Sequence, residues 1–422
     1  MLSVLIGKAA RGVSRIRGGG GSAFPGLVVE NLDKNFLART LKRLPRGVIV
    51  VSGTNGKTTT TKMVVELLEG QGLKVFTNRS GSNFTRGVVA SILGEVNLTG
   101  RLDADIAVLE LDEAHAVHFV KAVRPNYSLL LNVMRDQLDR FGEIDTTAAL
   151  LRTIAQHTAD GVTLNREDAR VRAIADSLQG QEVSFFGLSE QLRSHFPSDD
   201  DLHRGAANQA TDLPEAGVVL EELTEGGGTY RIGGEQVSTQ LTVNGAYNTF
   251  NSAAALAVVR QALGESVDQV ALIDALSRVS PAFGRGESLE VNGQPLDLVL
   301  VKNPSGFRLG LSSFSAEGVS TMIAINDNYA DGRDMSWLWD VSFESLRAQG
   351  VKRVTGVRAY DMALRLKYDA VPFDAVEPDL KKALDEFIAA EPERPKRVFC
   401  TYTAMLALRK HLSEYTEVEA FA

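Results

Sequence analysis

Cysteine is almost absent from the 422-residue chain, which contains Cys400 alone. One thiol cannot build an intramolecular disulfide framework or an all-cysteine metal site, so both are excluded. Long apolar runs are also missing, and none approaches the roughly 18 residues of a membrane-spanning helix. Basic residues are in the minority, since 45 Lys and Arg stand against 53 Asp and Glu and give a net charge of −8. We therefore expect a cytoplasmic protein with no bulk attraction to nucleic acid.

The remaining composition is that of a globular protein, with 44% hydrophobic and 23% charged residues and enough length for two or three domains. Short β-branched runs alternate with helical segments, which predicts an α/β fold with a parallel, doubly wound sheet. Proline and glycines in "SPAFGRGE" mark a domain boundary near residue 282. We predict an N-terminal segment over 1–45 that packs on a central domain over 46–282, followed by a Rossmann-like C-terminal α/β domain over 283–422.

The N-terminal segment, "MLSVLIGKAARGVSRIRGGGG", carries four basic residues, and no acid precedes Glu30. Its apolar run from Leu2 to Ile6 is too short for a signal peptide. Such a segment can lie on an anionic membrane surface. It can also form a short helix that ends at the glycines and packs on the first domain, and we favour this second interpretation. A peripheral position at the inner face of the membrane stays open.

The stretch "VIVVSGTNGKTTTTKM", residues 48–63, has a β-branched run, a glycine loop and a helical segment. A common phosphate-binding loop has four residues between its glycines, whereas only two separate Gly53 from Gly56. Glycines let a backbone approach a phosphate, and consecutive N–H groups at a helix N-terminus favour its negative charge. Lys57 is placed to reach the terminal phosphates of a nucleotide, and the hydroxyl of Thr58 is placed to bind Mg²⁺.

The segment "GTNGKTTT" resembles the ATP-binding loop of the Mur ligases, which share this compressed spacing with folylpolyglutamate synthases. The resemblance implies an ATP site formed by Gly53, Thr54, Asn55, Gly56, Lys57, Thr58 and Thr59. In "IAVLELDEAH", Glu110 lies near the end of an apolar run. A glutamate at this place holds Mg²⁺ in the family, which implies Thr58 and Glu110 as the Mg²⁺ ligands.

Three further segments are similar to family motifs. "NGAYNTFNSAAALA" resembles a motif whose asparagines lie at the nucleotide, which implies this position for Asn248 and Asn251. "FGRGE" resembles the entrance to the last domain, where Arg285 would meet the phosphates. "LLLNVMRDQLDRFGE" is similar to N-x-x-x-D-H-L-D-x-x-G, with Gln137 in place of the histidine, which argues against a metal role there. Its matching residues are Asn132, Asp136, Asp139 and Gly142.

The last domain lacks the aspartate-tyrosine-alanine-histidine segment of the amino-acid-adding Mur ligases. It has instead "LVKNPSGF" and "INDNYADGRDMSWLWDV", which resemble the MurT family, the synthetase subunits of lipid II isoglutaminyl synthases. The resemblance implies ATP-dependent amidation of the α-carboxylate of D-glutamate in the lipid II stem peptide, through an acyl phosphate, with Lys57, Glu110 and Arg285 as catalytic residues. An amino-acid-adding ligase of the Mur or folylpolyglutamate type is the alternative, and a nucleotide-binding regulatory module is a third hypothesis.

A glutaminase needs a reactive cysteine with a histidine nearby, and Cys400 in "KRVFCTY" has no histidine close in sequence. We predict that Cys400 is a core residue. The resemblance implies that ammonia comes from a GatD-like glutaminase subunit in a heterodimer, and that an aspartate of this chain orients the catalytic histidine of that subunit. We predict Asp334 for this role, with Asp331 second and Asp340 as a further candidate. The two tryptophans of "SWLWD" alternate, which indicates burial or a partner interface.

Several MurT proteins carry a four-cysteine zinc ribbon in the central domain. The corresponding region here, a polar excursion over about 189–234, contains no cysteine. Because thiolates are required for such a site, we predict no structural zinc.

Overall fold

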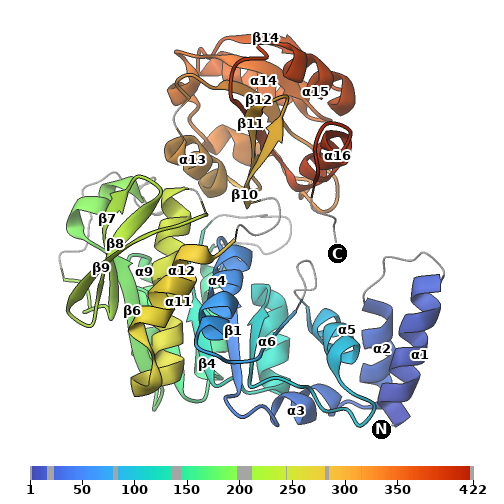
Figure 1. The fold of residues 1–422 in the computed structure, drawn as a ribbon, viewed down its shortest axis with the longest axis vertical. Coiled ribbons are helices and arrows are strands. Elements are labelled where there is room, and N and C mark those ends of the chain that lie inside the picture. Colours follow the sequence, from blue (N-terminus) through green and yellow to red (C-terminus); the bar gives the residue numbers. More distant parts are fainter. Residues whose placement is uncertain are drawn as a thin grey trace. The chain divides into compact units, whose positions relative to one another are not determined.

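The computed structural model describes residues 2–16, 23–78, 84–134, 144–196, 212–243, 245–280, 285–314 and 316–418. The chain divides into two compact units. One is built mainly from residues before Ser280 and the other mainly from residues after Val279 (Figure 1).

Within the described residues, the first unit contains a nine-stranded sheet in the order β2-β3-β1-β4-β5-β6-β7-β8-β9. Its strands are parallel from β2 to β7, while β7–β8 and β8–β9 are antiparallel. The strands β1 and β3 are continuous apolar runs in the sequence, apart from a polar residue at the end of each. Such runs are typical of parallel strands covered on both faces, and every residue of the two strands is buried. The strands are β1 (Val48–Ser52), β2 (Val75–Thr77), β3 (Ile106–Glu110), β4 (Tyr127–Leu130), β5 (Gly161–Asn165), β6 (Glu182–Leu188), β7 (Val218–Thr224), β8 (Gly227–Ile232) and β9 (Glu235–Gln240).

Helices cover this sheet, and the N-terminal part of the chain belongs to the same unit, because Val4 and Val29 lie in its core. Figure 1 shows the helices α1 and α2 side by side, next to α5. The helices are α1 (Leu2–Ile16), α2 (Ala23–Leu32), α3 (Phe36–Leu41), α4 (Lys57–Gly70), α5 (Thr85–Glu95), α6 (Glu113–Ala122), α8 (Ile144–Gln156), α9 (Ala169–Arg172), α11 (Ala246–Leu263) and α12 (Gln269–Arg278).

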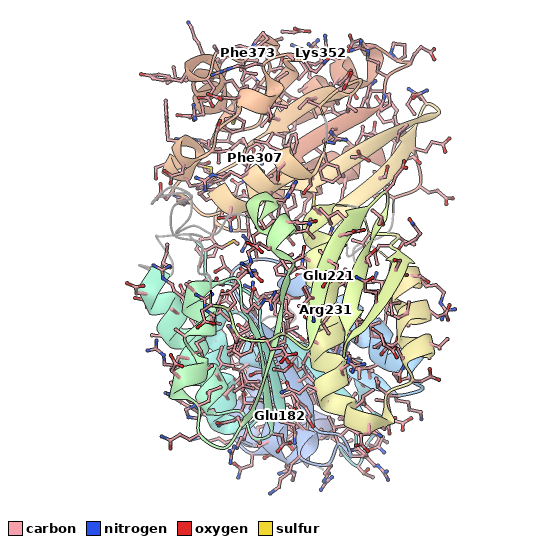
Figure 2. The ribbon with its side chains drawn as sticks, turned by 90° about the vertical axis from the view of Figure 1, so that its left-hand side faces the viewer. Glu182, Glu221, Arg231, Phe307, Lys352 and Phe373 are labelled. Atoms are coloured by element: carbon pink, nitrogen blue, oxygen red, sulfur yellow. The ribbon has the colours of Figure 1, made fainter. Side chains whose placement is uncertain are left out.

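The segment 189–234 is polar in the sequence, and its described part, residues 189–196 and 212–234, includes β7 and β8, which extend the sheet. The side chain of Tyr230 in β8 is fully buried, and its hydroxyl lies 2.6 Å from that of Ser252. On the partly exposed side, Arg231 donates to Glu221 of β7 over 2.8 Å (Figure 2). This period-two alternation of buried and partly exposed residues is that of a half-buried strand.

The second unit, in the part that the structure describes, has a six-stranded sheet in the order β10-β11-β15-β12-β13-β14, parallel except for β10. Phe307, labelled in Figure 2, belongs to the core on one face of this sheet. It packs edge-on against Phe343, and Cys400 is buried in the core on the other face. Its elements are β10 (Arg285–Val291), β11 (Gln294–Leu300), α13 (Pro304–Ser313), β12 (Ser320–Ala324), η5 (Ser336–Asp340), β13 (Val351–Thr355), α14 (Ala359–Tyr368), β14 (Phe373–Val376), α15 (Leu380–Ala389), β15 (Lys396–Cys400) and α16 (Tyr402–Leu412). The predicted α/β fold is confirmed, and so is the prediction that Cys400 is a core residue.

Candidate active site

The glycine loop joins β1 to α4, and both of its glycines are required by the backbone. Gly53 has φ 135° and Gly56 has φ 84°, values that residues with a side chain rarely adopt. A Cβ atom on Gly56 would also lie only 2.8 Å from the Oδ1 atom of Asn251. The short spacing therefore forms a tight turn that delivers the N-terminus of α4 to the carboxyl edge of the sheet, beside Asn251.

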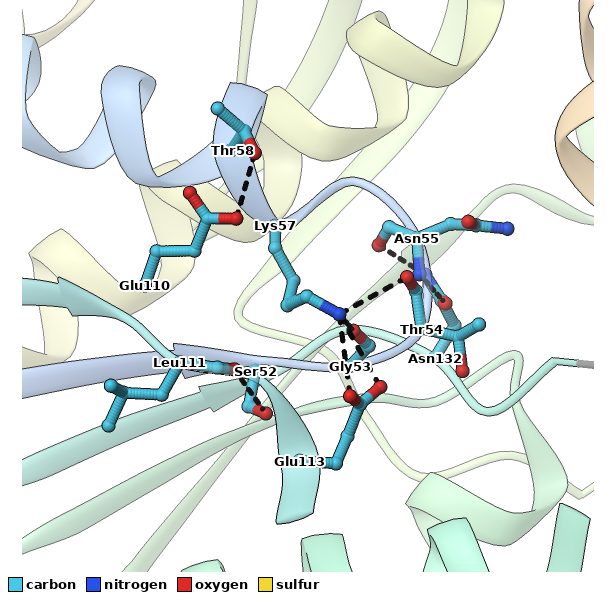
Figure 3. Close-up of polar contacts among 10 residues, drawn as sticks. All are labelled: Ser52, Gly53, Thr54, Asn55, Lys57, Thr58, Glu110, Leu111, Glu113 and Asn132. Atoms are coloured by element: carbon cyan, nitrogen blue, oxygen red, sulfur yellow. Dashed lines mark hydrogen bonds and ion pairs between the residues drawn. The ribbon is translucent and has the colours of Figure 1, made fainter. Parts of the chain in front are cut away.

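Asn132, which follows β4, holds the backbone of this loop (Figure 3). Its side-chain oxygen accepts from the N–H of Asn55 over 2.8 Å, and its amide nitrogen donates to the carbonyl of Asn55 over 3.0 Å. The backbone carbonyl of Asn132 accepts from the N–H of Thr54 over 3.0 Å. Asn132 is therefore a positioning residue for the loop.

Asp168 supports the residue that follows Asn132. One of its carboxylate oxygens accepts from the N–H of Val133 over 2.7 Å, and the other caps α9 through the N–H groups of Arg170 and Val171. Burial raises the pKa of Asp168, while these hydrogen bonds act in the opposite direction. Sequence reasoning missed this residue, and its only sequence signal is an aspartate at the start of a helix.

Lys57 is the first residue of α4, and its ammonium group is buried against its own loop. It donates to the carbonyl of Gly53 over 2.5 Å and to that of Thr54 over 3.3 Å. It also lies 3.4 and 3.5 Å from the two carboxylate oxygens of Glu113 (Figure 3). Lys57 and Glu113 are only 8% and 3% exposed, so this ion pair is largely removed from water.

Glu113 is the second site residue that sequence reasoning missed. It opens α6, three residues after the end of β3, and an acid in the first turn of a helix is an ordinary feature. Only the fold places its carboxylate beside the loop lysine.

Thr58 and Glu110 form the other half of the site, since the Thr58 hydroxyl donates to a Glu110 carboxylate oxygen over 2.8 Å. The backbone N–H and carbonyl of Glu110 are both bonded to the side chain of Asn78 over 2.9 Å, which fixes the end of β3. A hydroxyl beside a carboxylate fits Mg²⁺, which takes oxygen ligands and keeps several waters. No group of three or more His, Cys, Asp or Glu residues forms a metal cluster within the described ranges.

The other predicted nucleotide-site residues are distributed as follows. Thr59 is buried within α4, and Asn248 lies one turn before Asn251 in α11. Arg285 opens β10, but its side chain is outside the described part of the structure. Four motif residues also lie outside the described residues, namely Asp136, Gln137, Asp139 and Gly142. The fold thus brings Gly53–Thr58, Glu110 and Asn251 together.

Asp331 and Asp334 belong to the second unit and differ in their surroundings. Asp331 is buried and accepts from the N–H of Thr403 over 2.7 Å, from the Thr403 hydroxyl over 2.5 Å and from the N–H of Asn328 over 3.1 Å. Desolvation raises the pKa of Asp331. Asp334 is partly exposed and accepts from Ser336 N–H over 2.9 Å. Hydrogen bonding by the Ser336 side chain, and then by this N–H group, lowers the pKa of Asp334. The carboxylate of Asp331 is therefore hydrogen-bonded inside the unit, while the carboxylate of Asp334 is accessible at the surface.

The two tryptophans of η5 have different environments. Trp337 is 5% exposed and packs near Phe307, whereas Trp339 is 47% exposed and stacks edge-on with Tyr368 at 5.0 Å. The alternation in the sequence thus corresponds to one core residue and one surface residue.

Comparison with known proteins identifies the family. The Mur ligase middle domain family matches residues 51–259, and the MurT ligase C-terminal family matches residues 300–405. The MurT subunit of lipid II isoglutaminyl synthase (glutamine-hydrolyzing) from Streptococcus pneumoniae is 30% identical, over 98% of this chain and 96% of its own length. The chain belongs to the MurT family. The MurT subunit from Staphylococcus aureus (strain COL) is 27% identical over 90% of this chain and 91% of its own length.

Solved structures agree on the fold of this MurT family member. MurF ligase from Thermotoga maritima in complex with ADP superposes with a TM-score of 0.67 at 19% identity, over 91% of this chain and 84% of that chain. The Mycobacterium tuberculosis folylpolyglutamate synthase complexed with ADP and AMPPCP gives 0.61 at 17% identity, over 93% and 99%. The chain is a Mur ligase-type ATP-dependent ligase of peptidoglycan synthesis. None of the helices in the described residues is long and apolar enough to cross a membrane.

Proposed function

We propose that this chain amidates the α-carboxylate of D-glutamate in the stem peptide of lipid II and so produces D-isoglutamine. The observation that supports this proposal most directly is the buried Lys57 at the N-terminus of α4, beside the hydroxyl of Thr58 and the carboxylate of Glu110. This arrangement suits phosphoryl transfer to a carboxylate. The choice of carboxylate rests on the relatives that are named lipid II isoglutaminyl synthase subunits.

In the first step, a carboxylate oxygen of the substrate attacks the γ-phosphorus of ATP. An oxygen–phosphorus bond forms, the bond to the ADP oxygen breaks, and the product is an acyl phosphate. Negative charge on the transferred group is offset by the N–H groups of the glycine loop and by the N-terminus of α4. Lys57 adds a full positive charge once it exchanges its contacts with the loop carbonyls and Glu113 for the phosphates. Arg285 is expected to meet the same phosphates.

Thr58 and Glu110 would hold Mg²⁺ at this site, because a hydroxyl and a carboxylate oxygen already lie next to each other there. The ion, when bound, supplies charge neutralisation for the phosphate oxygens. Asn78 keeps the backbone of Glu110 in place, so the carboxylate is presented from a fixed strand end.

In the second step, ammonia attacks the carbonyl carbon of the acyl phosphate. A carbon–nitrogen bond forms, inorganic phosphate leaves, and the nitrogen loses a proton to give the amide. Cys400 is fully buried at the end of β15, and burial raises the pKa of its thiol, so it is unsuited to hydrolyse glutamine. Ammonia is therefore supplied by a separate GatD-like glutaminase subunit in a heterodimer, in keeping with the word "subunit" in the names of the relatives.

We assign to Asp334 the role of orienting the catalytic histidine of that partner subunit. Its pKa is lowered, so it is ionised at neutral pH, and its side chain is partly exposed. An exposed apolar surface of the same unit supports subunit docking, because Trp339 and Tyr368 form an exposed aromatic pair and Tyr360 and Leu364 are exposed on the same face of α14.

The experiment that tests this function uses the purified chain with ATP, Mg²⁺, lipid II and ammonium chloride. Mass spectrometry follows conversion of the D-glutamate carboxylate to its amide. Amide formation is the expected result, either with the chain alone or once a glutaminase subunit is added. Absence of product in both cases, with ATP hydrolysis stimulated by an amino acid instead, would overturn the proposal in favour of an amino-acid-adding ligase.

A further inference from the structure

Helix α1 contacts the rest of the first unit through an unusual face. Val4 is buried, and Gly7 sits so close to α2 and α5 that a Cβ atom there would lie 2.5 Å from a methyl group of Val29. One turn further, the guanidinium of Arg11 lies against Gly94 of α5. The packed face of α1 therefore runs through positions 4, 7 and 11, and it includes a basic residue.

The opposite face of α1 is apolar and turned away from the protein. Leu5 and Ile6 are 44% and 38% exposed, and Ala9, one turn later, is exposed as well. In the sequence, Val13 and Ile16 continue the same helical spacing. A surface helix of a globular protein normally buries its apolar stripe, so an outward stripe indicates a binding surface.

Among the described residues of the first unit, none buries Leu5 or Ile6. Figure 1 shows α1 as the outermost helix of the row formed by α5, α2 and α1. The neighbouring α2 also exposes Phe24 and Leu32. Apolar side chains are thus presented by both N-terminal helices.

The charge of the N-terminal segment indicates which kind of surface this apolar face would bind. Residues 1–29 contain Lys8, Arg11, Arg15 and Arg17 and no acid, although the whole chain has a net charge of −8. The rest of the molecule is acidic, and α2 itself contains Glu30 and no basic residue, so α1 is a basic helix on an acidic protein. Exposed apolar residues combined with an excess of basic residues are typical of helices that lie in the interface of an anionic bilayer.

We propose that α1 lies on the surface of an anionic lipid bilayer, with Leu5 and Ile6 inserted at the boundary between headgroups and acyl chains. Among the described basic residues, Arg11 faces α5, whereas Lys8 is partly exposed and would lie near lipid phosphates. The helix lies on the bilayer and does not cross it, in agreement with the absence of a membrane-spanning helix among the described residues. This proposal does not depend on the amidation reaction, although a lipid-linked substrate would be met at the same surface.

The test is co-sedimentation of the full chain with vesicles of phosphatidylglycerol and phosphatidylcholine, compared with vesicles of phosphatidylcholine alone. We expect binding to the anionic vesicles that weakens as salt is raised. The double variant Leu5→Glu/Ile6→Glu should lose roughly tenfold or more in partition. Val270→Glu is the matched control, since Val270 is an exposed apolar residue of α12 in the same unit.

Circular dichroism and thermal melting establish that the double variant is folded. Equal partition of the wild type and the double variant would overturn the proposal, as would equal binding to neutral and anionic vesicles. Sedimentation velocity without lipid provides a third check. A wild type that self-associates through this face, and a double variant that is monomeric, would make a second copy of the chain the occupant and would also overturn it.

Discussion

Lys57 in the first unit and Asp331 in the second are both buried charged side chains, but they have partners of different kinds. Asp331 accepts from two backbone N–H groups and one hydroxyl over 2.5 to 3.1 Å. Lys57 faces two carbonyls of its own loop and the carboxylate of Glu113, and three of these four distances are 3.3 to 3.5 Å. The partners of Asp331 fix a turn, whereas those of Lys57 can be exchanged for a phosphate group. Burial of a charge therefore does not by itself identify a ligand site; the exchangeability of its contacts is more informative.

The same contrast separates Asp331 from Asp334, which lie three residues apart. The carboxylate of Asp331 ties the loop after β12 to the start of α16, while that of Asp334 caps only the local turn at Ser336. A carboxylate with three internal donors has little capacity left for a partner subunit. Asp334 keeps that capacity, which supports its assignment to the histidine of the glutaminase.

The largest effect is expected from Lys57→Ala, which removes the exchangeable cation. Amidation driven by ammonium should fall by roughly 10²- to 10³-fold or more, because a charge at the transferred phosphoryl group is lost. Mass spectrometry of the lipid II product measures the rate. Lys62→Ala, on the same helix and in a surface pair with Glu66 at 3.8 Å, should leave the rate nearly unchanged. Loss of the complex with the glutaminase in the Lys57 variant would contradict a role limited to phosphate.

Asp334→Asn should separate the two nitrogen sources. Glutamine-driven amidation should fall by about 10²-fold or more, because an aspartate that orients a catalytic histidine is replaced by a neutral amide. Ammonia-driven amidation should be unchanged. Asp340→Asn serves as the comparison, and the selective loss in that variant instead would transfer the role to Asp340. Equal loss with both nitrogen sources would place Asp334 in the ligase site.

Asp331→Asn should act on stability. The amide has one acceptor oxygen where the carboxylate has two, so a donor would face the N–H groups of Thr403 or Asn328. We expect a loss of about 1–3 kcal/mol in the free energy of unfolding, measured by chemical denaturation. Asp361→Asn, at an exposed position of α14, is the control. A variant of normal stability that loses glutamine-driven activity would show that Asp331 serves the partner.

Part of this contrast was accessible from the sequence. Gly53, Lys57 and Thr58 are contiguous in a motif, and Glu110 ends an apolar strand, so local pattern was sufficient to bring them into one hypothesis. Glu113 and Asp168 were missed, because their roles depend on contacts that only the folded chain creates. The carboxylate of Asp168 accepts a hydrogen bond from Val133, which lies 35 residues earlier in the sequence. No periodic pattern in the sequence predicts a contact over that separation.

The N-terminal segment shows a different limit of sequence reasoning. A basic helix packed on the first domain was expected, and α1 does pack there. Helical periodicity identifies the apolar stripe through Leu5 and Ile6 but not its direction. Its apolar composition alone favours burial of that stripe. In the structure, however, the close approach of Gly7 to Val29 places the face with Val4, Gly7 and Arg11 against the protein. The exposed stripe is therefore a result of tertiary packing.

Glu113→Gln probes the exchangeable contact itself. The neutral amide no longer competes with phosphate for Lys57, so the KM for ATP should fall about threefold to tenfold with a small change in kcat. The nucleotide-free variant should melt at a lower temperature, because the buried Lys57 loses its counter-ion. Glu110→Gln should instead lower kcat. A higher KM for ATP in Glu113→Gln would mean that the carboxylate positions Lys57 for the phosphates.

The smallest effect concerns the acid titration of Asp331 and Asp334. The pKa of Asp331 is raised above its ordinary 3.8 by desolvation, and the pKa of Asp334 is lowered below 3.8 by its contact with Ser336. The stability that Asp331 contributes is therefore complete below 3.8 and is lost as the pH rises through its raised pKa. The contribution of Asp334 is present above 3.8 and is lost as the pH falls through its lowered pKa.

Carboxyl ¹³C chemical shifts, assigned with the two asparagine variants, should show these midpoints on opposite sides of 3.8. Coincident midpoints would mean that the interior carboxylate and the surface carboxylate share one environment. The distinction between a structural and a partner-facing aspartate would then fail, and the assignment of the glutaminase contact would rest on the nitrogen-source experiment alone.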